Sequence, residues 1–334
     1  MTPLPSKTAR TAPPDADSHD ADSHDPRSPA PDDPQAPHAP HSPAPDGPAT
    51  THASHAAAGA TAATRPVLSV RDVRIGHPAG DREIVHGVSF DLTPGKALGI
   101  VGESGSGKTL TCRAALGILP PPFEVTAGTV EIDGTPIAEL TPRQWTELRG
   151  TTISAVFQDP ASYLNPSLRV GAQIAEVLRV KKGLTRREAR ARSVELLRSV
   201  RLRDPELVHG QYPYELSGGM LQRVLIAAAI AAGPRILIAD EATTALDVTV
   251  QAEILDLLED LRERTGLALV VVSHDLAVVA QLCDEVLVMR GGEVVEQGPT
   301  SQVLHNPQHP YTRLLIAEHE QYGLDRFLAP EEAA

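Results

Sequence analysis

The sequence predicts an α/β fold with a largely parallel sheet, and three features support this prediction. The runs 97–101, 236–239 and 269–272 are almost wholly apolar, as expected of parallel strands that are covered on both faces. Between the last two runs, four apolar residues keep the spacing of an amphipathic helix: Ile254, Leu257, Leu258 and Leu261. A glycine-rich turn follows the first run, and the helical segment 110–116 follows that turn.

The glycine-rich turn fits the phosphate-binding pattern G-x-x-x-x-G-K-[ST], known as the P-loop. Glycines let backbone N–H groups curl around phosphate oxygens, and the positive end of the next helix points at them. We expect Lys108 to reach the β- and γ-phosphates of a nucleotide, and the Thr109 hydroxyl to ligate Mg²⁺. The predicted nucleotide-binding residues of this turn are Gly102, Ser104, Gly105, Gly107, Lys108 and Thr109.

Two further groups of residues have the chemistry that a nucleotide hydrolase needs. The buried run 236–239 ends in two carboxylates, of which Asp240 is expected to hold Mg²⁺ and Glu241 to polarise the attacking water. The Ser-Gly-Gly segment at 217–219 begins an apolar helix, and its N–H groups and hydroxyl predict a second anion site. One chain cannot fold both sites around one nucleotide if the two sites face opposite ways.

Composition limits the class of protein. The chain has 334 residues and a formal net charge of −13, which argues against nucleic acid as its main partner. Its two cysteines form neither a disulfide framework nor a metal cluster, so we expect a reducing compartment. No apolar run approaches the ~20 residues that span a bilayer, and the N-terminus lacks the apolar stretch of a secretory signal. We therefore predict a soluble, cytoplasmic chain that reaches a membrane only through partners.

Residues 1–65 differ in composition from the rest and are predicted to be a disordered tail. Pro, Ala, Asp, Ser and His dominate there, and such a segment buries too little apolar surface to offset the entropy of ordering. The tail contains six of the 13 histidines, and the sequence Asp-Ser-His-Asp occurs at 17–20 and again at 22–25. Imidazole and carboxylate together suit Ni²⁺ or Zn²⁺, so weak metal sequestration is one interpretation and a compositionally biased linker is the other.

The remaining chain divides into regions of strand and helix character. Segments 68–73 and 88–92 alternate like half-buried strands, and 129–132 leads into an Asp-Gly turn, which predicts an antiparallel β subdomain. The stretch from about 160 to 232 is predicted to be an inserted helical subdomain. Its arginine-rich helix at 186–200 is interpreted as a solvated face rather than as a surface for lipid or nucleic acid.

The motifs resemble those of the ATP-binding cassette (ABC) family in the family's order. The decisive stretch resembles the ABC signature: Leu216-Ser217-Gly218-Gly219-Met220-Leu221-Gln222-Arg223. The resemblance implies a Q-loop in which Gln158 contacts Mg²⁺ or the water, a D-loop at Asp247, and a switch in which His274 contacts the γ-phosphate. It also implies that two subunits pair head to tail, with each ATP between one P-loop and the signature of the other subunit.

Further stretches resemble the ATPase subunits of the dipeptide, oligopeptide and nickel importers. These stretches are 157–160, 164–166, 240–251 and the His-Pro-Tyr-Thr segment at 306–315. The resemblance implies an ABC ATPase domain at 66–300 and an importer-type segment at 301–334. It also implies a Mg²⁺-dependent ATPase at the cytoplasmic face of the membrane, peripheral to it. The implied partners are a second ATPase subunit, two membrane permeases and, indirectly, an extracellular binding protein.

Several alternatives remain open at this point. The same machinery could import nickel, and a soluble ABC ATPase of translation or DNA repair is a rival of another class. Against that rival, the chain has one P-loop, one signature and no coiled-coil insertion. The importer-like C-terminal segment argues against an exporter half. A P-loop kinase would not explain the signature or His274. The family's adenine-stacking aromatic is expected near Gly76 and His77, neither of which is Phe, Tyr or Trp.

Overall fold

The computed structural model describes residues 65–80, 82–243 and 246–320. All of them belong to the second of two contact units of the chain, residues 60–334. The predicted tail at 1–65, except its last residue, lies outside the described residues, as do two D-loop residues and the chain end after 320. Among the described residues, no helix is long and apolar enough to cross a membrane.

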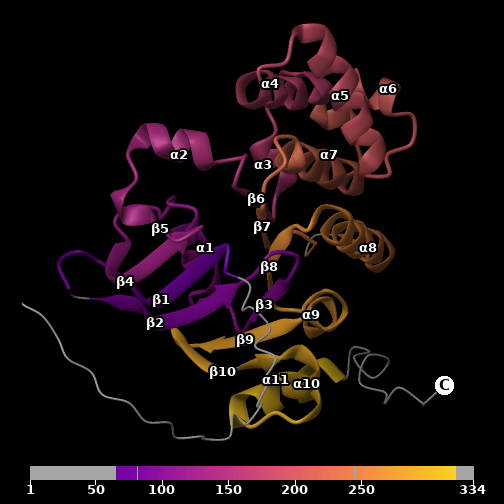
Figure 1. Ribbon diagram of the computed structural model, residues 1–334. Coiled ribbons are helices and arrows are strands. Elements are labelled where there is room, and N and C mark those ends of the chain that lie inside the picture. The colour runs from indigo at the N-terminus through magenta and orange to yellow at the C-terminus, as the bar shows by residue number, and fades with distance from the viewer. Residues whose placement is uncertain (1–64, 81, 244–245, 321–334) are drawn as a thin grey trace, which may run out of the picture. The chain divides into compact units, whose positions relative to one another are not determined.

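A six-stranded, mostly parallel sheet forms the centre of this unit (Figure 1). Its strand order is β10-β9-β3-β8-β7-β6, and only β10 runs antiparallel to its neighbour. The strands are β3 (Ala97–Val101), β6 (Ile153–Phe157), β7 (Ile236–Asp240), β8 (Ala268–Ser273), β9 (Glu285–Arg290) and β10 (Glu293–Pro299). The three predicted parallel strands are confirmed as β3, β7 and β8, which are buried along their whole length. Because parallel strands share one direction, their carboxyl ends meet at one edge of the sheet.

A separate four-stranded antiparallel sheet has the order β2-β1-β4-β5. Its strands are β1 (Leu68–Gly76), β2 (Glu83–Leu92), β4 (Glu124–Ile132) and β5 (Thr135–Pro136). One hydrophobic cluster joins this sheet to the parallel one, because Ile75 and Val85 pack in the same core as Ile100 and Cys112. Helix α1 (Lys108–Ala115), which begins at the P-loop, contacts both β1 and β4. The antiparallel sheet therefore helps to fix the helix that follows the P-loop.

Helices occupy most of the segment between 160 and 230, where the sequence predicts a helical subdomain (Figure 1). They are α3 (Pro160–Tyr163), α4 (Val170–Lys182), α5 (Arg186–Ser199), α6 (Pro205–His209), η2 (Pro213–Glu215) and α7 (Gly218–Ile230). Local sequence sets their ends: a capping box of Thr185 and Glu188 starts α5, and Gly183 ends α4 in the left-handed conformation. A short 3₁₀ turn, η1 (Ile137–Glu139), and α2 (Pro142–Leu148) come before this segment.

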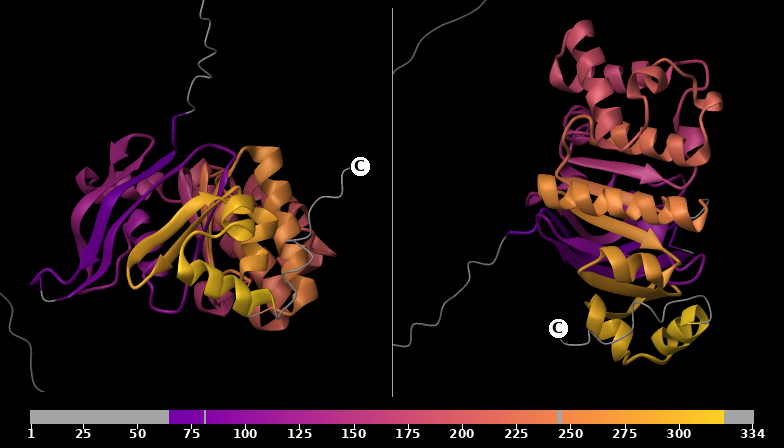
Figure 2. Two further views of the ribbon diagram at one scale, coloured as in Figure 1. Left: turned by 90° about the horizontal axis from the view of Figure 1, so that it is seen from below. Right: turned by 90° about the vertical axis from the view of Figure 1, so that its right-hand side faces the viewer.

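The C-terminal helices lie at the end of the sheet that β9 and β10 form (Figure 2), where α10 (Thr300–His305) contacts both strands. They follow α8 (Val248–Thr265) and α9 (Leu276–Leu282) and are α10 and α11 (Pro310–Glu320). Glu296 of β10 ties α11 to the sheet, because its carboxylate accepts the backbone N–H groups of Gln308 at 2.7 Å and His309 at 3.0 Å. The start of α11 is thereby fixed relative to β10.

Candidate functional site

The P-loop connects the end of β3 to the start of α1 in a shape that requires glycine. Gly102 has φ +146°, and a Cβ there would lie 2.0 Å from the Met289 carbonyl oxygen. Gly107 has φ +98° and precedes the first residue of α1. A Cβ at Gly105, by contrast, would meet nothing within 4 Å. The loop is therefore packed against β9 on one side and open on the other, as a phosphate cradle must be.

Lys108 is buried, and its ammonium group contacts neutral oxygens of the loop. Nζ donates to the carbonyl oxygens of Gly102 at 2.8 Å and Glu103 at 2.9 Å. Burial lowers the pKa of Lys108, and the nearby Glu241 and Asp240 carboxylates oppose that shift. The hydroxyl of Ser106 is buried without a hydrogen-bond partner among the described residues. A buried ammonium group that donates hydrogen bonds to neutral carbonyl oxygens suits a bound phosphate group.

Thr109 and Asp240 meet at the carboxyl edge of the parallel sheet. The Thr109 hydroxyl donates to Asp240 Oδ1 at 3.0 Å, across 131 residues of sequence. Asp240 is only 5% exposed, so burial raises its pKa, while the Thr109 hydrogen bond opposes the shift. Gln158 lines the same cavity as both residues. Hydroxyl, carboxylate and amide oxygens are the ligands that Mg²⁺ prefers, so the donor set fits this ion.

Glu241 adopts an unusual backbone conformation directly after the end of β7. Its φ is +51°, which few non-glycine residues adopt, and its N–H donates to the Val272 carbonyl at 3.0 Å. Its Oε1 lies 4.0 Å from Nδ1 of His274, which follows the end of β8. The structure thus brings the predicted base and the predicted switch histidine together.

Thr109 and Glu241 each line two cavities beside the P-loop within the described part of the chain. One, of about 280 Å³, includes Gln158 and Asp240. The other, of about 390 Å³, is lined by these residues: Arg82, Ile84, Ser104, Gly105, Gly107, Lys108, Thr109, Leu110 and Glu241. The P-loop, Asp240, Glu241 and Gln158 therefore surround one continuous stretch of surface.

Arg82 is a residue of this site that sequence reasoning missed. The sequence predicted the contact with the adenine base near His77, at the end of β1. Arg82 lies opposite His77 in the β1–β2 hairpin, because the N–H of His77 donates to the Arg82 carbonyl at 2.9 Å. His77 lines neither cavity, and its Nδ1 accepts the N–H of Ala79. The signal in the sequence was the Pro-Ala-Gly turn at 78–80, which predicts that the residues on its two sides lie together.

The signature and the D-loop lie together, away from these cavities. Ser217 caps α7 by accepting the N–H of Met220 at 3.4 Å, and Asp247 caps α8 by accepting the N–H of Val250 at 3.0 Å. Gly219 fits closely against α8, because a Cβ there would lie 2.6 Å from Val250 Cγ1. None of Ser217, Gly218, Gly219 and Asp247 lines either cavity at the P-loop. Within one chain, the two predicted anion sites remain separate.

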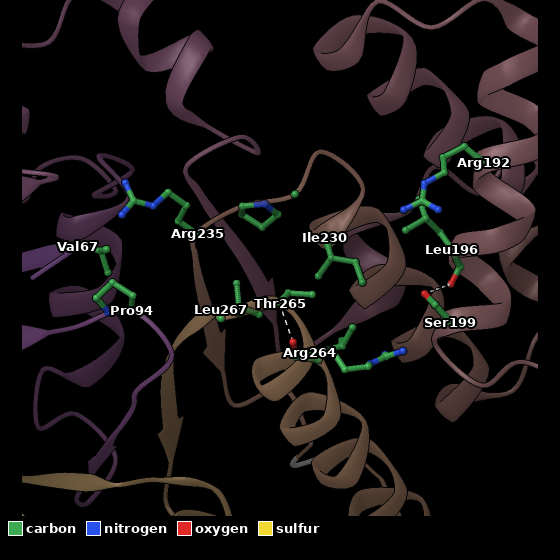
Figure 3. Close-up of a pocket in the computed structure, with 14 residues that line it drawn as sticks. Val67, Pro94, Arg192, Leu196, Ser199, Ile230, Arg235, Arg264, Thr265 and Leu267 are labelled. Carbon is green, nitrogen blue, oxygen red and sulfur yellow. Dashed lines mark hydrogen bonds between the residues drawn. The ribbon is translucent and has the colours of Figure 1, made fainter. Parts of the chain in front are cut away.

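A third cavity, of about 530 Å³, contains none of the predicted site residues (Figure 3). It lies where α5 and the end of α7 face the end of α8, and it is lined by Arg192, Arg235 and Arg264 among others. Each of these arginines already forms an ion pair, with Glu195, Asp133 and Asp260 respectively. The positive charge that these arginines bring to the cavity is therefore largely balanced by carboxylates of the same chain.

Sequence comparison places the chain among known proteins. The ABC transporter family profile matches residues 85–244. The profile for the C-terminal region of oligopeptide/dipeptide transporters matches residues 295–320. The probable D,D-dipeptide transport ATP-binding protein DdpD of Escherichia coli K12 is 42% identical over 270 residues, which are 80% of this chain and 82% of that relative. The chain belongs to the ABC transporter family.

Further similarities agree with this assignment. The dipeptide transport ATP-binding protein DppD of Lactococcus lactis is 44% identical to this ABC protein over 253 residues, 75% of this chain and 72% of that relative. Among solved structures, a dimeric, post-hydrolysis ATP-binding cassette, MJ0796 bound to ADP and Pi, matches with a TM-score of 0.61 at 30% identity. That match covers 70% of this chain and 98% of the cassette. The predicted fold, a P-loop ABC nucleotide-binding domain, is confirmed.

Proposed function

We propose that this protein is the ATP-hydrolysing subunit of an importer for dipeptides or oligopeptides. The observation that supports it best is a pair of features in one chain. The P-loop, Asp240, Glu241 and His274 form one cluster, and the segment 295–320 matches the oligopeptide/dipeptide transporter region. Relatives whose names specify dipeptide transport are similar over three quarters or more of this chain.

In the proposed reaction, the chain's own residues bind the triphosphate and move one proton. The Lys108 ammonium and the N–H groups of the P-loop bind the β- and γ-phosphates, and Thr109, Asp240 and Gln158 would hold Mg²⁺. When bound, Mg²⁺ neutralises negative charge on the phosphates. Water attacks the γ-phosphorus, its proton passes to the Glu241 carboxylate, and the bond to the β-phosphate oxygen breaks to give ADP and phosphate.

Two further side chains have proposed roles at the edges of this site. His274, beside Glu241, donates a hydrogen bond to the transferred phosphoryl group. Arg82 lines the P-loop cavity, whereas neither Gly76 nor His77 supplies the family's base-stacking aromatic, and we infer that the Arg82 guanidinium stacks on adenine instead. In this scheme, the signature residues do not contact the nucleotide that is bound at the P-loop of their own chain.

The unused signature supports a composite site made by two ATPase subunits. Ser217 and Gly218 are exposed at the start of α7, where N–H groups and the helix dipole favour an anion. We propose that they, Gly219 and Asp247 complete the P-loop site of a second subunit, identical or paralogous. Closure of this dimer around two ATP would change the conformation of the membrane subunits.

The surface after Gln158 supports docking to membrane permeases. Tyr163 and Leu168 follow Gln158 in the chain and are 51% and 49% exposed. Tyr163 also lines the cavity that contains Gln158 and Asp240, so this exposed apolar surface adjoins the proposed nucleotide site. We propose that this surface attaches the subunit to two permeases at the cytoplasmic face of the membrane. An extracellular binding protein would then deliver the peptide to those permeases.

Copurification tests the proposal. Glu241→Gln protein with ATP is captured from detergent-solubilised native membranes, with Lys108→Ala protein as the control that cannot hold nucleotide well. We expect two multi-span membrane subunits to copurify with the Glu241→Gln protein. Capture of ribosomal or DNA-repair proteins without a membrane subunit would contradict the transport function. If the captured permeases are encoded together with a nickel-binding protein, the cargo is nickel rather than a peptide.

A further inference from the structure

The C-terminal segment directly contacts the P-loop. The hydroxyl of Tyr311, in the first turn of α11, accepts the backbone N–H of Glu103 at 3.0 Å. These residues are 208 positions apart, and Tyr311 is only 6% exposed. Tyr311 lies within the segment 295–320 that matches the oligopeptide/dipeptide transporter region. The contact therefore joins the part of the chain typical of this subfamily to the loop that binds nucleotide.

The peptide group between Gly102 and Glu103 is held on both sides. Its N–H donates to Tyr311, while its carbonyl oxygen, that of Gly102, accepts from Lys108 Nζ at 2.8 Å. A trans peptide is planar and its N–H and C=O point in opposite directions, so rotating the group would disturb both bonds. Tyr311 is therefore linked through one rigid unit to the lysine expected to bind the β- and γ-phosphates.

Neighbouring contacts keep Tyr311 in this position. The Arg290 guanidinium lies over the Tyr311 ring, 4.7 Å from its centroid, and Arg290 Nε lies 4.0 Å from Glu103 Oε1. Glu296 fixes the start of α11, and the β9–β10 hairpin bonds to the P-loop where the Gly292 N–H donates to the Ser106 carbonyl at 3.2 Å. The C-terminal elements thus form a rigid support on the side of the loop away from Gly105.

We propose that Tyr311 is a positioning residue for nucleotide binding, through which the C-terminal segment sets the affinity of the P-loop. The inference rests on nucleotide binding by this chain and is independent of the transported cargo. Tyr311→Phe keeps the ring and the stacking of Arg290 but removes the acceptor of the Glu103 N–H. The variant loop samples orientations that move the acceptor of Lys108, so part of the binding free energy is spent on ordering it.

The test is calorimetric titration of the full-length protein with ADP and Mg²⁺, well below its melting temperature. The loss of one neutral hydrogen bond predicts a Kd roughly two- to ten-fold higher for Tyr311→Phe than for wild type. Leu314→Ala, which changes an exposed side chain on the same helix, is the matched control and is expected to bind as wild type does. Thermal melting without nucleotide is measured on each variant.

The readouts separate positioning from mere support of the fold. A lower melting temperature for Tyr311→Phe with an unchanged Kd would overturn the proposal, as would wild-type values of both. If Tyr311→Phe does not fold, Arg290→Gln replaces it, with Arg290→Lys as the charge-preserving rescue. A Kd for ADP that is raised in Arg290→Gln but not in Arg290→Lys supports the proposal. Equal Kd values for the two variants overturn it. Wild-type protein that binds no ADP would instead contradict the proposed function itself.

Discussion

The chemistry of the site depends on a few side chains whose surroundings change their behaviour. Glu241 follows a fully buried strand, has a positive φ and lines both cavities at the P-loop. Asp240, one residue earlier, is buried and bonded to Thr109. Adjacent carboxylates thus have different environments, which fits one for binding a cation and the other for accepting a proton.

Glu241→Gln is expected to abolish turnover without abolishing nucleotide binding. The amide keeps the shape of the side chain but cannot accept a proton, so we expect phosphate release to fall by about 10²- to 10⁴-fold. The variant should also retain ATP and an ATP-dependent dimer. Phosphate release and ATP binding are measured beside Glu263→Gln, an exposed glutamate on α8, as control. Normal turnover in the Glu241→Gln variant would assign the base to another residue.

Asp240→Asn is expected to stabilise the nucleotide-free protein near neutral pH. Burial raises the Asp240 pKa above its usual 3.8, so the folded protein holds this proton more tightly than the unfolded chain does. The resulting penalty is absent below pH 3.8 and complete above the raised pKa. At about pH 7, the free energy of unfolding of Asp240→Asn should therefore exceed that of wild type. This difference should shrink toward about pH 4.

Urea denaturation at several pH values measures this difference. The same variant should bind nucleotide with less dependence on Mg²⁺, because a neutral amide is a weaker ligand than a carboxylate. A variant less stable than wild type at neutral pH would show that the Thr109 hydrogen bond outweighs the cost of burying the charge.

At the residue scale, the sequence predicted local structure where the motif is short, while the roles of its residues stay predictions. The P-loop, the Asp240-Glu241 pair and the Ser-Gly-Gly segment are short motifs, and the structure places them, as expected, at a strand–helix turn, a strand end and a helix start. Arg82 and Tyr311 were not found in this way. The turn at 78–80 indicates that Arg82 lies beside His77, but it does not indicate the P-loop, which Arg82 and Tyr311 each reach from another element.

At the scale of elements, hydrophobic patterns predicted the buried strands better than the exposed ones. Strand β4 spans Glu124–Ile132, whereas the sequence predicted only 129–132, because its first six residues are exposed and show no alternation. Strand β6 was missed, since five residues with two partly exposed small side chains give a weak signal. Pairing with β7 rather than intrinsic preference fixes β6 in the sheet.

The contact between α7 and α8 gives a prediction for packing. Gly219→Ala would bring a Cβ to 2.6 Å from Cγ1 of Val250, a stiff β-branched side chain. We expect this variant to lose about 1–3 kcal/mol of unfolding free energy. Adding Val250→Ala removes the clashing methyl group, so the double variant should be more stable than the sum of the single effects implies. Additive effects in a urea-denaturation cycle would show that the two helices do not pack as described.

At the scale of the whole molecule, the proposed dimer requires one subunit to carry halves of two different nucleotide sites. Its P-loop cavities contain no signature residue, and the signature helix begins at an exposed end. The motifs that predict an ABC ATPase belong to this nucleotide site, which every ATPase of the family needs whatever its cargo. In the proposed importer, the substrate contacts other subunits, so no residue of this chain needs to distinguish a peptide from nickel.

The central claim is that ATP hydrolysis by this chain drives peptide import. The most direct measurement is accumulation of a radiolabelled dipeptide in vesicles that contain the captured complex, supplied with ATP and the binding protein. We predict ATP-dependent accumulation with wild-type protein and none with Glu241→Gln, while radioactive nickel does not accumulate with either. Accumulation of nickel but not of dipeptide, or dipeptide uptake that persists in the Glu241→Gln complex, would contradict the account.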